Sequence, residues 1–224
     1  MRGMFITFEG GEGAGKSTQI RRLVERLRSS VNGPCDVVCT REPGGSSGAE
    51  QIRTLILGSN GEFDPLAEAL LFAAARADHV RKLIIPALDR GAVVICDRFM
   101  DSTAAYQGAG STVPAEIVAD LARIAVGGTT PDLTFILDVD PVIGVGRAGR
   151  RNASSSVGDD RFEREALDFH HRVRNAFLGI ATANSERCHV IDASQSVDDV
   201  TMDIWRAVHE RIESISEQSE LKAR

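Results

Sequence analysis

Nine consecutive residues near the start of the chain have the types and the spacing of a phosphate-binding loop. They are Gly10, Gly11, Glu12, Gly13, Ala14, Gly15, Lys16, Ser17 and Thr18. The first eight match G-x-x-x-x-G-K-[ST], in which the glycines let backbone N–H groups turn toward phosphate oxygens. In such a loop (the P-loop) the lysine contacts the β and γ phosphates of a nucleoside triphosphate, and the serine hydroxyl binds Mg²⁺. An ordinary glycine-rich turn is the alternative, but the match follows a predicted strand and opens a predicted helix, as a nucleotide site requires.

A second set of polar residues begins where another predicted strand, residues 92–97, ends. Open α/β sheets bind ligands at this edge. Asp97 is a candidate to hold Mg²⁺ through water, and Arg98 is a candidate to bind the phosphate of an acceptor molecule with two hydrogen bonds. Ser102 and Tyr106 follow, one helical turn apart, and Gln107 comes next. A purely structural Asp–Arg ion pair is an equally good interpretation of this strand end.

A third candidate site lies on the helix predicted from Asp64, a capping residue that is followed by proline. Glu68, Phe72 and Arg76 are four residues apart and share one stripe, which leaves the aromatic ring between two charges. A flat ring with an arginine one turn further along suits the binding of a nucleobase, although a core phenylalanine on a broadly apolar helix would have the same spacing. The core stripe predicted for this helix is Leu66, Leu70, Ala73 and Ala77.

Two classes of nucleotide-binding protein compete: an enzyme that transfers phosphate to a small acceptor, and an NTPase whose hydrolysis drives a switch or a motor. A GTPase switch reads guanine with Asn-Lys-x-Asp, and the three lysines of the chain, at 16, 82 and 222, form no such element. A small-molecule kinase needs an acceptor pocket, arginines around the phosphates and a flap that excludes water. We predict the flap at residues 147–160, which contain a run of serines. The net charge of −6 argues against nucleic acid as a partner.

The order of the predicted elements is that of a parallel sheet covered by helices. Short apolar segments predict five strands, at residues 4–9, 36–40, 92–97, 133–139 and 189–192. They alternate with helical patterns, the first of which carries apolar residues from Ile20 to Val31 and stops at 32–34. We therefore predict an α/β fold with one domain over residues 1–215 and a polar tail over residues 216–224.

The last helix is predicted from Val197 to Ile215 and begins with a capping box at Ser196 and Asp199. Its predicted buried stripe is Val197, Val200, Ile204, Val208, Ile212 and Ile215. His170 and His171 lie on another predicted helix, which is long and charged, and there we favour a solvated face over a metal site.

The composition predicts a cytoplasmic protein with no membrane partner. The longest apolar run is seven residues, 69–75, and about 20 are needed to span a bilayer. The chain opens without a basic-then-apolar leader. The four cysteines stand in apolar stretches without metal-ligand spacing, and we expect reduced core residues. They are Cys35, Cys39, Cys96 and Cys188.

Further stretches complete a pattern that resembles the thymidylate kinase family. They are Thr40-Arg41-Glu42-Pro43-Gly44-Gly45, Asp97-Arg98-Phe99 with Ser102 and Ala105-Tyr106-Gln107-Gly108, and Pro131-Asp132-Leu133. With the P-loop in its N-terminal place, the similarity runs from about Met4 to Trp205. The resemblance implies transfer of the γ-phosphate of ATP to dTMP, giving dTDP and ADP in dTTP synthesis, with Mg²⁺ as cofactor. It also implies a nucleoside-monophosphate-kinase fold with five parallel strands, a mobile lid at about residues 145–163, and a cytoplasmic homodimer.

The same resemblance implies roles for residues in the acceptor site. Phe72 would stack on thymine, and Arg76 would bond its O4 atom. Arg41 and Arg98 would hold the dTMP phosphate. Tyr106 would lie against the sugar, where a 2′-hydroxyl would clash. Three further residues complete the implied dTMP site: Glu12, which approaches the 3′-hydroxyl, Ser102 and Gln107.

The resemblance also implies where the catalytic arginine lies. Some members of the family carry an arginine after the acidic residue of the P-loop, but this position is Gly13 here. The arginine is then expected from the lid, as in the bacterial subgroup. Arg147, Arg150 and Arg151 precede the serine-rich insert and Arg161 follows it. The predicted catalytic set is Lys16, Asp97, Arg98, Arg151 as the first lid candidate and Arg161 as the second.

Overall fold

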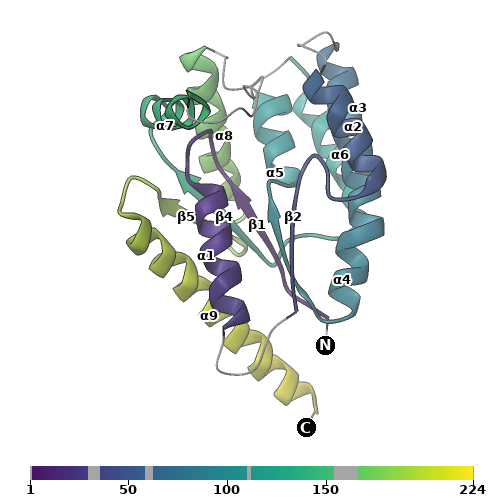
Figure 1. Ribbon diagram of the computed structural model, residues 1–224. Helices are drawn as coiled ribbons and strands as arrows, with labels where there is room; N and C mark the ends of the chain where they lie inside the picture. The colour runs from purple at the N-terminus through teal and green to yellow at the C-terminus, as the bar shows by residue number, and fades with distance from the viewer. Residues whose placement is uncertain (1, 30–35, 59–62, 110–111, 154–165, 224) are drawn as a thin grey trace.

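The computed structural model describes residues 2–29, 36–58, 63–109, 112–153 and 166–223 (Figure 1). Five parallel strands form one sheet in the order β2-β3-β1-β4-β5. They are β1 (Phe5–Glu9), β2 (Val37–Arg41), β3 (Val93–Asp97), β4 (Leu133–Asp138) and β5 (Cys188–Asp192). Each predicted strand is present with its ends within one residue of the predicted bounds. The predicted α/β fold with five parallel strands is confirmed.

Helices connect the strands and cover both faces of the sheet (Figure 1). They are α1 (Lys16–Arg28), α2 (Ser47–Gly58), α3 (Pro65–His79), α4 (Ile85–Asp89), α5 (Met100–Thr103), α6 (Ala115–Val126), α7 (Pro141–Ala153), α8 (Leu167–Ala183) and α9 (Val197–Ala223). Two π-helical segments, η1 (Val80–Ile84) and η2 (Ala104–Ala109), follow α3 and α5. As predicted, Asp64 caps α3: its Oδ1 accepts a hydrogen bond of 2.9 Å from the Leu66 N–H.

The core fills the space between the sheet and the helices on each face. On one face, α1 and α9 bury Leu23 and Val208 against Phe8 and Phe135 of the sheet. On the other, η1 and α4 cover Phe5, whose ring meets that of Phe99 edge to face at 4.9 Å. A third apolar cluster lies near β4 and β5, where residues of η2 and α8 pack together. Burial of these apolar groups on both faces explains why the strand sequences are almost entirely apolar.

All five strands end in a charged residue. These residues are Glu9, Arg41, Asp97, Asp138 and Asp192. Because the strands are parallel, their carboxyl ends lie at the same edge of the sheet, and the registers place Arg41 opposite Asp97 and Phe8 opposite Asp97. The edge at which α/β sheets bind ligands is therefore charged along its whole length.

The predicted core stripe of α3 is wrong. Leu66 and Leu70 are 41% and 49% exposed, whereas Ala73 is buried as predicted. The side of α3 that faces inward carries Glu68 and Arg76 instead, and both side chains are buried. An apolar helix offers more than one possible core face, and here the charged face is turned inward, where Glu42, directly after β2, and Gln107 of η2 are its polar partners.

The last helix begins with the predicted cap, but its buried stripe is shorter at both ends than predicted. Ser196 and Asp199 form the predicted capping box, with the Asp199 N–H donating to Ser196 Oγ at 3.2 Å. Val200, Ile204 and Val208 are buried, whereas Val197 and Ile212 are exposed. The helix also continues to Ala223, where a polar tail was predicted after Ile215.

Three further expectations are corrected by position in the fold. Cys39 is exposed because β2 is an edge strand, whereas Cys96 and Cys188 are buried as predicted. His170 is buried under the P-loop, so the solvated face predicted for it is wrong. The first part of the predicted flap, through Ala153, is helical and belongs to α7. The rest of the flap, residues 154–160, and Cys35 lie outside the described residues.

None of the helices in the described parts of the chain combines the length and the apolar character needed to cross a membrane.

Candidate active site

A cavity of about 530 Å³ opens at the charged edge of the sheet. It brings together residues from the P-loop, β2, α3, β3 and the α5–η2 segment. Of the predicted site residues, its walls contain Glu12, Gly13, Ala14, Gly15, Lys16, Ser17, Thr18, Arg41, Phe72, Arg76, Asp97, Arg98, Ser102, Tyr106 and Gln107. Residues that were predicted from four separate stretches of sequence therefore share one cavity.

The P-loop connects β1 to α1, as its sequence context predicts. Gly15 caps α1 with a left-handed backbone, φ 94°, which suits glycine. Lys16 is almost fully buried, and its Nζ donates to the carbonyls of Gly10 and Gly11 at 3.1 and 3.0 Å. Burial, together with the nearby charge of Arg98, lowers the pKa of Lys16. The ammonium group lies inside the loop, at the position from which it can turn toward bound phosphates.

Ser17 and Asp97 meet across the gap between the P-loop and β3. The Ser17 hydroxyl donates to Asp97 Oδ2 at 3.3 Å, and Asp97 Oδ1 is buried without a hydrogen-bond partner among the described residues. Within the same residues no three acidic, histidine or cysteine side chains gather as a metal centre. A pair of one hydroxyl and one carboxylate fits Mg²⁺, which takes most of its ligands from phosphates and water.

Arg98 occupies the centre of the cavity in an unusual backbone conformation. Its φ is 66°, the one positive φ of a non-glycine residue in the described parts of the chain. Its guanidinium donates to the Gly10 carbonyl at 3.1 Å, to Tyr106 Oη at 3.2 Å and to the Glu12 carboxylate. A left-handed arginine costs backbone energy, so neighbouring contacts must hold it there.

Glu9 supplies those contacts from the end of β1. Its carboxylate is fully buried and accepts from the Phe99 N–H at 2.8 Å and from Ser102 Oγ at 2.5 Å. Phe99 directly follows Arg98, and Ser102 also accepts a hydrogen bond from Arg98 Nη1 at 3.2 Å. Glu9 thus fixes the backbone directly after Arg98 and the Ser102 hydroxyl, which contacts the Arg98 guanidinium.

Burial dominates the electrostatics around Arg98. Desolvation, and then the charge of Asp101, raise the pKa of Glu9 to about 8, while Ser102, Arg98 and Phe99 act in the opposite direction. Burial also raises the pKa of Tyr106. For Arg98, burial opposes the charged form, but the oxygens of Tyr106, Glu12 and Asp97 outweigh it and raise the pKa. Arg98 therefore remains a cation that is available to an anionic ligand.

The predicted base-binding pair stands at the other end of the cavity. Phe72 is half-buried on its wall, outside the described apolar clusters. Arg76 is 2% exposed and donates from Nε to Glu42 Oε2 at 2.7 Å and from Nη2 to the Phe99 carbonyl at 3.0 Å. Its Nη1 is buried and has no hydrogen-bond partner among the described residues. The arrangement is an aromatic wall beside one unused N–H donor.

Two other predicted residues are held by acidic partners. Arg41 extends from the end of β2 and donates to Glu50 Oε2 at 3.0 Å on the exposed rim of the cavity. Gln107 is buried and donates to Glu68 Oε1 at 3.1 Å. This bond joins Gln107 of η2 to Glu68 of α3.

The start of the predicted lid packs directly on the P-loop. A Cβ atom at Gly13 would lie 1.9 Å from the Gly144 carbonyl oxygen, and one at Gly144 would lie 2.4 Å from the Glu12 carbonyl. Gly13 also has a φ of 66°. Helix α7 can approach this closely because both residues lack side chains, so position 13 has no room for an arginine.

Two of the four lid arginines, Arg147 and Arg150, have side-chain contacts within the described residues. Arg147 donates to the Ala193 carbonyl at 3.1 Å, and Arg150 donates from Nε to the Gly146 carbonyl at 3.1 Å. Arg151 belongs to the last turn of α7, but its side chain, like the whole of Arg161, lies outside the described residues.

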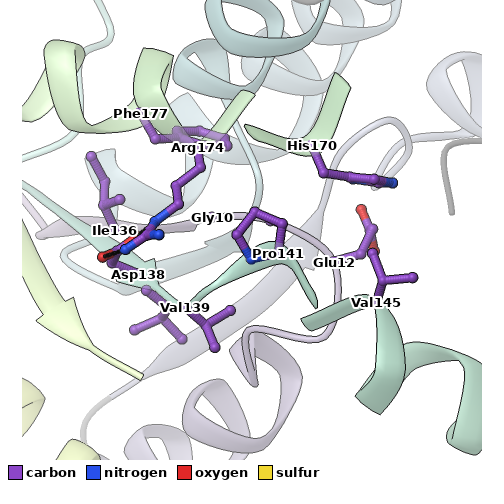
Figure 2. Close-up of a pocket in the computed structure, with 12 residues that line it drawn as sticks. Gly10, Glu12, Ile136, Asp138, Val139, Pro141, Val145, His170, Arg174 and Phe177 are labelled. Atoms are coloured by element: carbon purple, nitrogen blue, oxygen red, sulfur yellow. Dashed lines mark hydrogen bonds and ion pairs between the residues drawn. The ribbon is translucent and has the colours of Figure 1, made fainter. Parts of the chain in front are cut away.

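Behind the P-loop lies a second, much smaller cavity of about 20 Å³, shown in Figure 2. Gly10 and Gly11 of the predicted nucleotide site line this cavity. Arg174 of α8 reaches the end of β4, where its Nε and Nη2 donate to the two Asp138 oxygens at 2.7 and 2.8 Å. His170, one turn earlier on α8, faces the same space. These contacts attach α8 to the sheet edge beneath the P-loop.

The sequence analysis assigned no role to four residues that the structure brings to the site. Glu9 accepts from the Phe99 N–H next to Arg98, Glu42 binds Arg76, His79 contacts Glu42, and Arg53 lines the cavity. A signal was present for Glu9, because it is a carboxylate that ends an otherwise apolar strand. Glu42 lies in one of the family stretches, but its partner Arg76 is 34 residues away and belongs to another element.

Comparison with known proteins gives one consistent result. The family model described as thymidylate kinase matches residues 8–204. A thymidylate kinase of Caulobacter vibrioides is 50% identical, over 94% of this chain and 98% of its own length. One of Rhodopseudomonas palustris is 51% identical, over 95% of this chain and 91% of its own. The solved thymidylate kinase of Ehrlichia chaffeensis is 37% identical, with a TM-score of 0.73 over 93% of this chain and 99% of its own.

The raised pKa of Glu9 predicts a specific pH dependence of stability. Below about pH 4.5 the Glu9 carboxyl is protonated in both the folded and the unfolded protein. Between pH 4.5 and about pH 8 it keeps the proton only in the folded protein. The free energy of unfolding contributed by Glu9 is therefore lost as the pH rises through this window. Glu9→Gln removes the titration, so chemical denaturation from pH 5 to 8 should show the variant gaining stability relative to the wild type.

Glu116→Gln, a change of the same type on the exposed side of α6, is the control and should follow the wild-type curve. Parallel curves for Glu9→Gln and the wild type would contradict the assignment.

Proposed function

The chain belongs to the thymidylate kinase family, and from this premise we propose how its own residues serve the reaction. The reaction is the transfer of the γ-phosphate of ATP to dTMP, which gives dTDP and ADP in dTTP synthesis. One observation supports the assignment of residues: the P-loop, Arg98 and the Phe72–Arg76 pair line a single cavity. Such a cavity offers one end to the phosphates of ATP and the other to a nucleobase.

The acceptor nucleotide would extend from Phe72 to Arg98. Phe72 would stack on thymine, and the unused Nη1 of Arg76 would donate to O4 of the base. Arg98 and Arg41 would bind the dTMP phosphate, with Ser102 and Gln107 completing the pocket. Tyr106 is fixed by Arg98, Glu12 and the rings of Phe169 and Phe177, so it would leave no room for a 2′-hydroxyl.

The donor nucleotide would lie on the P-loop, with its phosphates on the backbone N–H groups and at the start of α1. Lys16 would leave the carbonyls of Gly10 and Gly11 for the β and γ phosphates. Ser17 and Asp97 are the residues that would hold Mg²⁺. When bound, Mg²⁺ neutralises phosphate charge.

Catalysis in this site would rest on charge and position. The acceptor is already an anionic phosphate, so no strong general base is needed. The barrier lies in bringing two polyanions into line, and Lys16, Arg98 and a lid arginine would offset their repulsion and stabilise the transition-state charge. We assign the lid arginine to Arg151 first and Arg161 second, because Gly13 has no room for one.

The protein would act as a homodimer. Five apolar side chains are exposed on α2, α3 and α6, which lie next to one another in the fold (Figure 1). They are Leu55, Leu66, Leu70, Ile117 and Ile124. An exposed apolar surface of this kind marks a contact with another protein, and a second copy of the chain would cover it. A cytoplasmic location is supported by the free thiols of Cys96 and Cys188.

The assay that tests the function measures ADP release from ATP with a panel of nucleoside monophosphates. We expect dTMP to be the preferred acceptor by kcat/KM. Lys16→Ala should lower kcat at least ~100-fold with the fold retained, because a contact to developing phosphate charge is lost. Faster phosphorylation of AMP or CMP would refute the acceptor assignment, and ATP hydrolysis without any acceptor would favour a switch or motor.

The lid arginines give a second test. Arg151→Ala or Arg161→Ala should lower kcat at least ~100-fold with little change in the KM for dTMP, since an arginine on the transferring phosphoryl group is worth ~10³ or more. Arg147→Ala and Arg150→Ala remove the same charge from earlier positions of α7 and are the matched controls. If Arg151→Ala and Arg161→Ala both retain wild-type kcat, the charge must come from elsewhere.

The proposed dimer surface is tested by sedimentation. Leu70→Glu places a charge in the centre of the exposed apolar surface and should convert the dimer to a monomer at micromolar concentration. Ile212→Glu, on the exposed side of α9, is the control and should leave the mass unchanged. A wild-type protein that sediments as a monomer at all concentrations would exclude the dimer.

A further inference from the structure

A chain of four polar side chains lies behind the cavity wall that carries Arg76. Arg76 Nε donates to Glu42 Oε2 at 2.7 Å, and Glu42 Oε1 lies 2.9 Å from His79 Nδ1. On the other side of the ring, His79 Nε2 lies 2.8 Å from Thr40 Oγ1. We call Thr40, His79, Glu42 and Arg76 the relay. It joins two residues of α3 to two residues at the end of β2.

The relay is buried, which makes its hydrogen bonds consequential. His79 is 0% exposed, and Glu42 and Arg76 are also buried. A buried carboxylate with an unsatisfied oxygen is costly, so Glu42 depends on both the arginine and the histidine. Loss of either partner would leave one oxygen of Glu42 without its donor, and the carboxylate could then rotate toward a new one.

The partners determine the tautomer of His79. Glu42 is an acceptor, so His79 Nδ1 must carry the hydrogen. His79 Nε2 lies 2.8 Å from the Thr40 hydroxyl, which can donate to the ring or accept from it. The rigid imidazole ring thus connects the hydroxyl on one side to the carboxylate on the other. The Thr40 hydroxyl therefore holds the ring, and the ring holds Glu42.

The turn after β2 closes tightly over the relay. Gly45 has a φ of 86°, and a Cβ atom there would lie 2.3 Å from His79 Nε2 and 2.4 Å from Thr40 Oγ1. The ring and the hydroxyl are thus packed against the backbone and have no space to turn. This packing fixes the last two members of the relay.

The relay determines which nitrogen of Arg76 is left to bind a ligand. Glu42 and the Phe99 carbonyl use Nε and Nη2, which fixes the plane of the guanidinium and leaves Nη1 as a buried donor without a partner among the described residues. A guanidinium donates and never accepts. A base that presents a carbonyl to this atom gains a hydrogen bond, whereas one that presents an amino group leaves both groups unsatisfied.

We propose that His79 is a positioning and specificity-determining residue, which together with Thr40 fixes Glu42 and so directs Arg76 Nη1 at the carbonyl of the base. The inference rests on the proposed function, because Arg76 must meet the base for the relay to matter. Its substrate class is a pyrimidine monophosphate with a carbonyl at position 4, in preference to one with an amino group there.

The test compares dTMP with dCMP as acceptors in the ADP-release assay. His79→Phe keeps the ring and removes both hydrogen bonds, and Thr40→Val removes the last one alone. We expect His79→Phe to lower the ratio of kcat/KM for dTMP over dCMP about 10-fold, mainly through a higher KM for dTMP, because a tenfold change is the scale of one lost hydrogen bond. Thr40→Val should lower the ratio in the same direction by a smaller factor.

Two further variants separate this role from general stability. His79→Gln retains a donor for Glu42 and should restore most of the ratio. Asp78→Asn is the matched control: Asp78 precedes His79 on α3 and accepts from Ser46, outside the relay, so the ratio should remain that of the wild type. The KM for ATP should be unchanged in all of these variants.

Arg76→Met distinguishes failure of this inference from failure of the proposed function. If Arg76→Met leaves the ratio unchanged, the base does not meet Arg76 and the proposed acceptor site is wrong. If Arg76→Met lowers the ratio but folded His79→Phe and Thr40→Val do not, the relay is structural and the inference is overturned. Should His79→Phe fail to fold, Thr40→Val decides: an unchanged ratio overturns the inference, and a lowered ratio supports it.

Discussion

The parallel pairing of β1 with β3 is the constraint on which the site depends. Its register brings the end of β1 beside Asp97, so that Glu9 can accept the Phe99 N–H and the Ser102 hydroxyl. Those two bonds hold Arg98 in a left-handed conformation in the wall of the cavity. The same register lets Ser17, at the start of α1, reach Asp97. The phosphate end of the site is thus assembled by one strand pair.

Both central arginines are held by carboxylates, Arg98 by the partly buried Glu12 and Arg76 by the buried Glu42. Buried ion pairs add little to stability, because desolvation of the two charges offsets their attraction. Their effect here is on orientation. Each carboxylate uses part of a guanidinium and leaves other N–H groups for a ligand, which gives the cavity two cationic groups of fixed direction and different task.

The contact between Gly13 and Gly144 connects the P-loop to the lid. Because each backbone approaches where the other would carry a Cβ atom, α7 begins against the loop that would bind ATP. The same contact leaves position 13 without room for a cationic side chain. This steric contact is the reason why the proposed catalytic arginine is sought in another segment of the chain.

The five strands, the P-loop and the stripe of Phe72 and Arg76 could be predicted from the amino-acid pattern alone. These features are local: apolar runs specify buried strands, glycines specify the loop backbone, and a four-residue spacing specifies one face of a helix. Only the tertiary structure decided which face of α3 is buried. Leu66 and Leu70 are as apolar as a core stripe requires, but the partners of Arg76 lie directly after β2 and after β3. The same holds for Cys39, which is exposed because strand order makes β2 an edge, and for His170, which α8 places beneath the P-loop.

The carboxylates of Glu9 and Glu42 became recognisable as site residues only in the fold, since their partners are 90 and 34 residues away along the chain. Burial and long-range pairing depend on which elements meet, and no local pattern encodes that.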